Sequence, residues 1–238
     1  MVASTEERVV AAQLNQFQSN KLADQLRQSS DDLTRMARSY VETGDPIFEQ
    51  YFFDILAIRD GTQPRPRDYD NIYWDFVIAS GERLKSSEPP AALIDLMKQT
   101  GMTDDELAKL EEAKLNSDDL TSLEKVAFAA MKGLFADELG ILTVKGEPNP
   151  ELARGLLYGV RYHEAKAKIM GPIRDFIKLV DERTRHELEA VQAQEVIYRI
   201  IAGFLIVATI LFSLGAVYYV NRSEIFKRLR AEEKLKDR

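Results

Sequence analysis

The feature that most constrains this chain is an uncharged apolar stretch near its C-terminus, Ile200–Val220, with the sequence IIAGFLIVATILFSLGAVYYV. As a helix rising ~1.5 Å per residue, it would be roughly 32 Å long, which is enough to cross the hydrocarbon core of a bilayer. Tyr198, Tyr218 and Tyr219 lie at its ends, where aromatic rings favour the membrane interface. We therefore expect a transmembrane helix over residues 198–220. The alternative, a buried core helix, rarely runs so long without a charge.

The flanks of this stretch predict its orientation. Residues 221–238 carry a net charge of +3 in a chain whose formal total is −7. Their basic residues are Arg222, Lys227, Arg228, Arg230, Lys234, Lys236 and Arg238. An excess of Lys and Arg beside a span marks the cytoplasmic side of a membrane. We expect residues 221–238 to be a cytoplasmic juxtamembrane segment and residues 1–197 to be extracytoplasmic.

Export of residues 1–197 requires a signal peptide or a first membrane helix. The longest apolar run in residues 1–20 is Val9–Ala12, well short of the ~7–15 residues in the apolar core of a signal peptide. We therefore expect a first transmembrane helix that precedes this sequence. The alternative is a cytoplasmic protein anchored by its C-terminus, which would place the basic tail on the wrong side.

The chain before the span has a helical pattern nearly throughout. In the first segment, apolar residues recur three or four positions apart, with Ser29 filling one step, as in a helix packed lengthwise on others. These residues are Leu22, Leu26, Leu33, Met36 and Tyr40. Further helices are expected over residues 46–60, 70–84, 91–100, 103–134 and from 150 into the membrane. We expect residues 137–150 to form an irregular loop. The predicted fold is all-α: an antiparallel, four-helix-like bundle that runs into one C-terminal transmembrane helix.

Several helix boundaries have specific signals. Asp45-Pro46 and Asn149-Pro150 each suit an N-cap followed by the first helical position. Thr103 and Glu106 match a capping box, in which side chain and backbone bond reciprocally across the first turn. Pro172 lies inside the last predicted helix, where we expect a kink.

One short motif occurs twice. The sequence Ser-Asp-Asp-Leu-Thr stands at Ser30–Thr34 and again at Ser117–Thr121. The similarity extends outward, with Arg27 matching Lys114, Met36 matching Leu123 and Arg38 matching Lys125. Two explanations stay open: a duplicated helical hairpin, or chance helped by the preference of Ser and Asp for helix starts.

Aromatic and arginine side chains alternate between residues 48 and 76. Rings combined with guanidinium groups suit the capture of an organic anion or a polar small molecule. The alternative is that the rings close the end of the bundle while Arg and Asp pair on its surface. The candidate ligand-binding residues are Arg59, Arg65, Arg67, Tyr69, Tyr73, Trp74 and Asp75.

Composition argues against other classes of function. The chain has no cysteine, and its only histidines, His163 and His186, would lie ~35 Å apart on one helix, too far to share a metal. No nucleotide-binding loop, nucleophile elbow or paired-carboxylate signature is present, so we expect no catalytic residue and no cofactor. The overall acidity argues against nucleic acid as a partner.

Three segments of the chain carry a family resemblance: SSDDLTRMARSYVETGDP (29–46), YFFDILAIRDGTQPRPRDYDNIYWD (51–75) and ILTVKGEPNPELARGLLYGVRYHEAKAKIMGPI (141–173). Together they resemble the all-helical extracytoplasmic input domains of bacterial transmembrane receptors. The resemblance is to sensor histidine kinases above all, and it implies a periplasmic bundle between two membrane helices of the inner membrane. No proline-marked HAMP pattern follows the span; residues 227–238 instead look like the start of a signalling helix.

From the residues and the resemblance we expect the input region of a two-component sensor histidine kinase. Binding of an unidentified small molecule, or of a periplasmic binding protein, would shift the transmembrane helix of a homodimer. Two alternatives remain: the input region of a chemoreceptor or diguanylate cyclase, and a membrane-anchored helical adaptor without a small ligand. The adaptor would use an apolar face around Phe52, Phe53 and Ile55.

Overall fold

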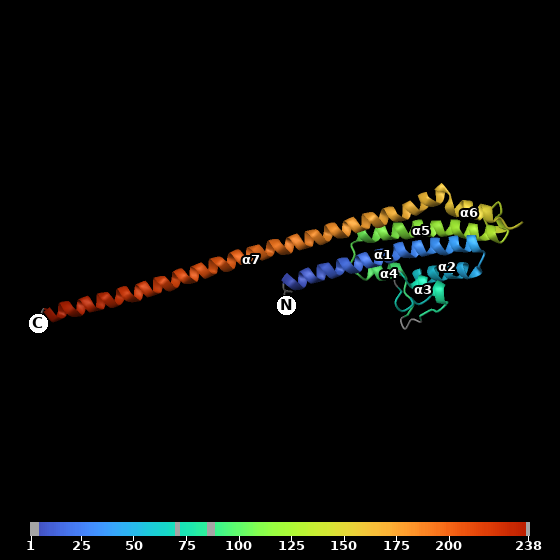
Figure 1. Ribbon diagram of the computed structural model, residues 1–238. Helices are drawn as coiled ribbons and strands as arrows, with labels where there is room; N and C mark the ends of the chain where they lie inside the picture. The colour runs from blue at the N-terminus through green and yellow to red at the C-terminus, as the bar shows by residue number, and fades with distance from the viewer. Residues whose placement is uncertain (1–4, 70–71, 85–88, 237–238) are drawn as a thin grey trace. The chain divides into compact units, whose positions relative to one another are not determined.

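The computed structural model describes residues 5–69, 72–84 and 89–236. These residues form seven helices and one two-stranded sheet (Figure 1). The helices are α1 (Thr5–Thr43), α2 (Pro46–Arg59), α3 (Tyr73–Ser80), α4 (Leu93–Lys98), α5 (Asp104–Met131), α6 (Pro150–Tyr158) and α7 (Val160–Lys236). The predicted all-α class is confirmed.

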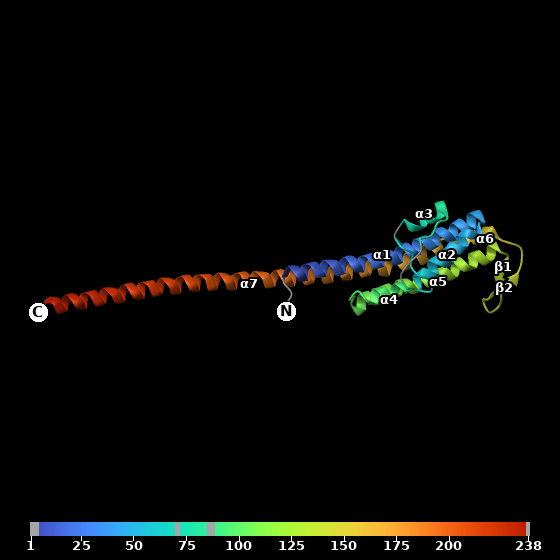
Figure 2. The same ribbon diagram turned by 90° about the horizontal axis from the view of Figure 1, so that it is seen from below.

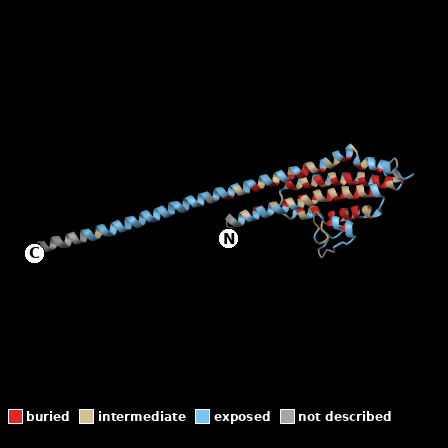
Figure 3. Ribbon diagram, viewed as in Figure 1, coloured by how far each residue is buried: buried red, intermediate tan, exposed pale blue. Residues whose placement is uncertain are grey.

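The chain divides into two compact units. The larger, which we call the core unit, is Val10–Arg185; the second consists of the residues up to Val9 together with His186–Arg238. In the core unit, α1, α2, α5 and the first part of α7 run lengthwise beside one another (Figures 1 and 2). Their facing sides are buried and their outer sides are exposed (Figure 3).

The predicted apolar seam of α1 forms part of this core. Leu26, Leu33, Met36 and Tyr40 are buried, and Leu22 packs against them while partly exposed. Spacings of three and four residues place such side chains on one helical face, so all of them turn toward α2, α5 and α7. Burial of these side chains is the main source of stability for the unit.

The predicted helix boundaries agree closely with the structure at three places. Gly44 has φ +70°, the left-handed conformation that ends α1, and the Asp45 carboxylate accepts a hydrogen bond from the Ile47 N–H at 3.0 Å. The capping box of α5 is complete, with Glu106 N–H donating to Thr103 Oγ1 at 3.3 Å and Thr103 N–H donating to Glu106 at 2.9 Å. Asn149 caps α6 through the Leu152 N–H.

Two expectations for residues 134–160 were wrong. The segment expected to be an irregular loop, 137–150, contains β2 (Leu142–Lys145), which pairs antiparallel with β1 (Leu134–Ala136) just before that segment. The turn between the strands is held by the Asp137 carboxylate, which accepts bonds from two backbone N–H groups and the Thr143 hydroxyl. The single helix expected from Pro150 is divided at Gly159, where extended backbone separates α6 from α7. Glycine has low helix propensity, which favours a break there.

Two other helices are shorter than predicted. Helix α3 covers Tyr73–Ser80 instead of 70–84, and Asp70 lies outside the described residues. Gly81 ends it with φ +73°. Helix α4 covers Leu93–Lys98. Pro172 lies inside α7, and the kink expected there stays a prediction.

Among the described residues, one helix is long and apolar enough to cross a membrane, and that stretch belongs to α7. None of its most apolar part is buried against other parts of the chain. Phe204, Leu211 and Phe212 are at least 64% exposed, and this region of α7 is uniformly exposed in Figure 3. An apolar surface of this extent is unusual for a helix in water and typical of one in lipid.

Candidate functional site

The structure brings four of the seven predicted ligand residues together. The rings of Tyr69 and Tyr73 are 5.1 Å apart and those of Tyr73 and Trp74 are 5.3 Å apart. The Trp74 indole N–H donates to the Tyr69 hydroxyl at 3.1 Å, and the Arg65 guanidinium lies over the Tyr69 ring at 5.5 Å. Burial raises the pKa of Tyr69 to about 12. These residues pack α3 and the preceding loop onto α1 and α2.

The other three predicted residues have different surroundings. The Arg59 side chain is buried and contacts α5, donating to Ser117 Oγ at 2.9 Å and to Asp118 at 2.6 Å. Asp75 forms an ion pair with Arg35 of α1. Arg67 is 74% exposed beside Asp68 on the loop. Ligand binding by these seven residues stays a prediction.

Sequence reasoning missed Arg83, which contributes to the same aromatic group. Its guanidinium lies 5.0 Å from the Tyr51 ring centre and forms a 2.7 Å ion pair with Asp54. A pocket of about 280 Å³ lies here, lined in part by Tyr73, Trp74 and Arg83. No local pattern marks Arg83, because Asp54 and Tyr51 are on α2 and reach it only through the tertiary fold.

A chain of buried polar side chains joins α1, α5 and α7. The Tyr162 hydroxyl lies 2.5 Å from Glu124 Oε1 and 2.9 Å from Thr34 Oγ1. The Thr34 hydroxyl donates to the Ser30 carbonyl at 2.9 Å, so its oxygen is available to accept from Tyr162. Tyr162 has one proton to donate, either to Glu124 Oε1 or to Thr34; while it donates to Thr34, its oxygen can accept a hydrogen bond from a neutral Glu124 carboxyl. Each group has a partner when Glu124 is protonated.

Burial shifts the pKa values of these buried polar side chains. Desolvation raises the pKa of Glu124 to about 7, although the Tyr162 hydrogen bond and nearby Lys166, Arg59 and Arg38 oppose the rise. Burial also lowers the pKa of Lys166 and raises that of Tyr162. An acid of this kind changes charge near neutral pH, which ordinary glutamates do not.

Each of the two Ser-Asp-Asp-Leu-Thr segments contacts a basic side chain from another helix. Lys166 of α7 donates to Ser30 at 2.9 Å and lies 2.9 Å from Asp31. Arg59 of α2 contacts the equivalent pair, Ser117 and Asp118. Both segments lie well inside α1 and α5, so the explanation of the motif as a helix start was wrong.

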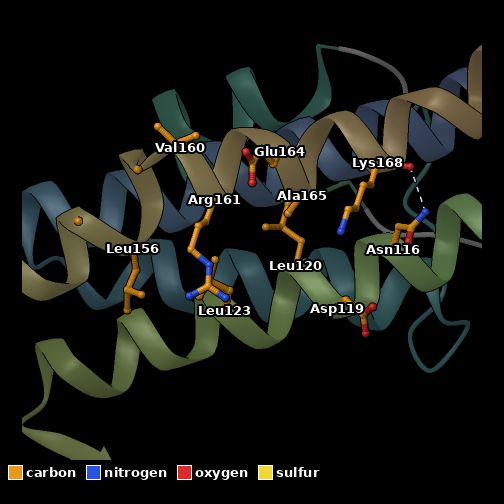
Figure 4. Close-up of a pocket in the computed structure, with 12 residues that line it drawn as sticks. Asn116, Asp119, Leu120, Leu123, Leu156, Val160, Arg161, Glu164, Ala165 and Lys168 are labelled. Carbon is orange, nitrogen blue, oxygen red and sulfur yellow. Dashed lines mark hydrogen bonds between the residues drawn. The ribbon is translucent and has the colours of Figure 1, made fainter.

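A groove of about 620 Å³ lies between α5 and the α6–α7 corner (Figure 4). Its lining is apolar around Leu120, Leu123 and Leu156, with Ala165 pointing in from α7 (Figure 4). The charged residues that line it are Asp119, Arg161, Glu164 and Lys168. Within the described parts of the chain, none of these four forms an ion pair. The Asn116 side chain crosses to the Lys168 carbonyl at 3.0 Å and closes one end of the groove.

The described residues contain no group of three or more His, Asp or Glu side chains arranged to hold a metal ion. No protein-family model, no curated protein and no solved structure matches this chain. The groove and the buried polar chain are therefore interpreted from their own chemistry.

Proposed function

We propose that this chain is the signal-input region of a bacterial transmembrane receptor, most simply of a two-component sensor histidine kinase. In this proposal residues 1–197 are a periplasmic, antiparallel four-helix-like bundle, residues 198–220 are a single span of the inner membrane, and residues 221–238 begin a cytoplasmic signalling helix. The receptor is a homodimer, and its catalytic output lies beyond this sequence.

One observation carries the proposal: a single helix, α7, contains both a wall of the groove and the apolar stretch. Val160, Glu164 and Lys168 line the groove, and Ile200–Val220 lies further along the same helix. Packed helices move between discrete arrangements, so a ligand that favours one arrangement shifts the helix as a rigid element. The net +3 charge of the tail supports its cytoplasmic location.

The input regions of chemoreceptors and diguanylate cyclases use the same kind of coupling, and the proposal extends to them. The adaptor hypothesis has less support. Phe52 and Ile55, which were to form its exposed apolar face, are both 0% exposed in the core, and only Phe53 reaches the surface, at 43% exposure. That expected face is therefore not available to a partner.

A chimeric receptor tests the proposal. The chain is joined after Arg238 to a histidine kinase core, in each of several helical registers, and autophosphorylation is measured in inner-membrane vesicles. We expect Glu124→Gln in the core unit to change kinase activity in at least one register. Replacing Arg185 and His186 with two glycines should abolish that change, because glycine weakens the helix between the unit and the span.

The matched control is Leu139→Gly, which creates a second Gly-Gly pair with Gly140 in the exposed β1–β2 turn. It should leave the response to Glu124→Gln intact. Kinase activity that is the same for every core-unit variant in every register would refute the input function.

A further inference from the structure

The two repeated segments make it possible to compare two halves of the core unit residue by residue: the α1 half, with α1 and α2, and the α5 half, with α5 and the first part of α7. An offset of 87 residues aligns Ser30–Thr34 of α1 with Ser117–Thr121 of α5. The contacts repeat with the sequence. Arg27 pairs with Asp31 at 2.8 Å, and Lys114 pairs with Asp118 at 2.8 Å.

The contacts between halves are also reciprocal. Arg59 of α2 reaches the motif on α5, and Lys166 of α7 reaches the motif on α1. In this comparison α5 corresponds to α1, and α7 corresponds to α2. The surface between α1 and α2 therefore corresponds to the surface between α5 and α7.

On the faces of α1 and α5 that meet in the core, equivalent residues are buried in both helices. Leu26 and Ala113, Leu33 and Leu120, and Val41 and Phe128 are all buried pairs. Burial differs along one strip. Ser29, Asp32 and Met36 of α1 are buried, whereas their counterparts Asn116, Asp119 and Leu123 of α5 are partly or fully exposed and line the groove.

The cover over the strip on α1 is formed by residues 65–69 and 72–83 of the same chain. Arg65 donates to Gln25 at 2.7 Å, Asp75 pairs with Arg35, and Trp74 stacks at 5.4 Å on Tyr51 of α2. Trp74 is 1% exposed, so this segment fills the cleft between α1 and α2 with an aromatic anchor. The equivalent cleft between α5 and α7 has no such segment from the described chain, and it is the open groove.

We propose that the open groove binds a short amphipathic helix of a partner protein, in the way that α3 fills the equivalent cleft. This helix has an aromatic anchor residue and both acidic and basic residues. Charge complementarity supports this occupant. The segment that fills the first cleft offers Asp75 to Arg35 and Arg83 to Asp54. The open groove offers Asp119 on the α5 wall, and two basic residues and one acid, Arg161, Lys168 and Glu164, on the α7 wall.

The dimensions of the groove also suit a helix. Its walls run from Asn116 to Leu123 and from Val160 to Lys168, about two helical turns on each side. Amphipathic helices bind such grooves through apolar anchors spaced three or four residues apart. This inference rests on the proposed input function and identifies the partner as a protein segment instead of a small molecule.

The test uses the full chain in lipid nanodiscs and a fluorescein-labelled peptide with the sequence of residues 69–84. Binding is followed by fluorescence anisotropy. We expect saturable 1:1 binding that weakens at least ~tenfold when Trp74 of the peptide is replaced by alanine. In the protein, Leu123→Arg and the exposed change Asp119→Arg should each weaken binding ~tenfold or more.

The matched control is Leu115→Arg, on the same helix at a residue that is 65% exposed and lies outside the groove. It should change affinity less than ~twofold. The emission of Trp74 in each protein variant, unchanged from the parent, shows that the core unit is folded. Asp119 is exposed, so its variant stays informative if Leu123→Arg fails to fold.

Three results would overturn the inference. They are no binding of the peptide, binding that both groove variants leave unchanged, and a chain dimer that Leu123→Arg dissociates, which would make a second copy the occupant. The nanodisc assay involves no kinase, so absent peptide binding would leave the chimera result intact. A silent chimera that still binds the peptide would refute the input function alone.

Discussion

Ser30–Thr34 of α1 and Ser117–Thr121 of α5 have the same sequence and hold cations in the same way, but the halves around them differ in two respects. The strip beside the first is covered by α3, and the strip beside the second is open as the groove. Three residues past the motif, α1 has Ala37 at 0% exposure and α5 has Glu124 at 1% exposure. At this position one half thus has an apolar side chain, and the other has a buried acid next to an open surface.

This difference suggests that one half mainly stabilises the fold and the other mainly responds to pH and to a bound partner. A buried, covered strip contributes packing and has little freedom to change. A buried carboxyl with a pKa near 7 has two protonation states near neutral pH, and an open groove can be empty or occupied. Substitutions in the α1 half should mainly cost stability, whereas those in the α5 half should mainly change what the domain binds and how it responds near neutral pH.

The largest expected effect comes from removing the cover of the closed half. Trp74→Ala deletes a ring that is 1% exposed, and it should lower the free energy of unfolding by about 3–5 kcal/mol. Urea unfolding in detergent micelles, followed by far-UV circular dichroism, measures this. Phe76→Ala, on the same helix but 65% exposed, is the control and should cost less than ~0.5 kcal/mol. Equal effects would mean that α3 does not seal the α1 strip.

A matched pair of substitutions sharpens the comparison. Met36→Ala removes a side chain that is 0% exposed and should cost about 2–5 kcal/mol. The equivalent change Leu123→Ala affects a half-buried groove residue, and it should cost less than ~1.5 kcal/mol because water already reaches the site. Unfolding followed by the emission of Trp74 gives both values. A larger loss for Leu123 would contradict an open groove.

Between about pH 6 and 7 the pH dependence of stability should come mainly from Glu124 in the α5 half. Burial raises the pKa of Glu124 from its ordinary value to about 7, so between pH 4.5 and 7 the folded chain holds a proton that the unfolded chain releases. This group's contribution to stability is therefore full at low pH, and it falls by roughly 3 kcal/mol as the pH rises through this window.

Glu124→Gln cannot titrate, so the difference in unfolding free energy between parent and variant should change by that amount between pH 5 and 8. Urea titrations at both pH values measure it. Asp32→Asn provides a comparison in the α1 half, because burial raises the pKa of Asp32 only to about 6. The pH range in which Asp32 changes the stability should end about one pH unit below that of Glu124. A difference between parent and Glu124→Gln that is constant with pH would contradict the buried neutral acid.

The smallest expected effects concern the repeated ion pairs on the helix surface. Arg27→Ala removes the pairs with Asp31 and Asp24, and Lys114→Ala removes the pairs with Asp118 and Asp60. All four contacts are partly exposed, so each change should cost less than about 1 kcal/mol, and both effects should weaken in high salt. Thermal unfolding at two ionic strengths compares them. Effects of opposite sign would show that the two motifs are not equivalent.

The local features of this protein could be predicted from nearby residues in its sequence. Apolar spacing of three and four residues gave the helices, Asp45-Pro46 and the Thr103–Glu106 box gave their boundaries, and Ile200–Val220 gave a segment apolar enough for a membrane. Each of these depends on residues within a turn or two of one another, so a local pattern contains the whole signal. The division at Gly159 and the β1–β2 hairpin were local too, but weak turn signals did not reveal them.

Only the tertiary structure decided which side chains meet. Arg59 looked like part of an aromatic ligand site, yet its partners Ser117 and Asp118 are on α5, and Arg83, with no sequence signal, joins Tyr51 and Trp74. The groove exists because two equivalent strips receive different cover, which no pattern within one helix encodes. Contacts between residues far apart in sequence depend on how whole helices pack, and the burial of a charge such as Glu124 follows from that packing.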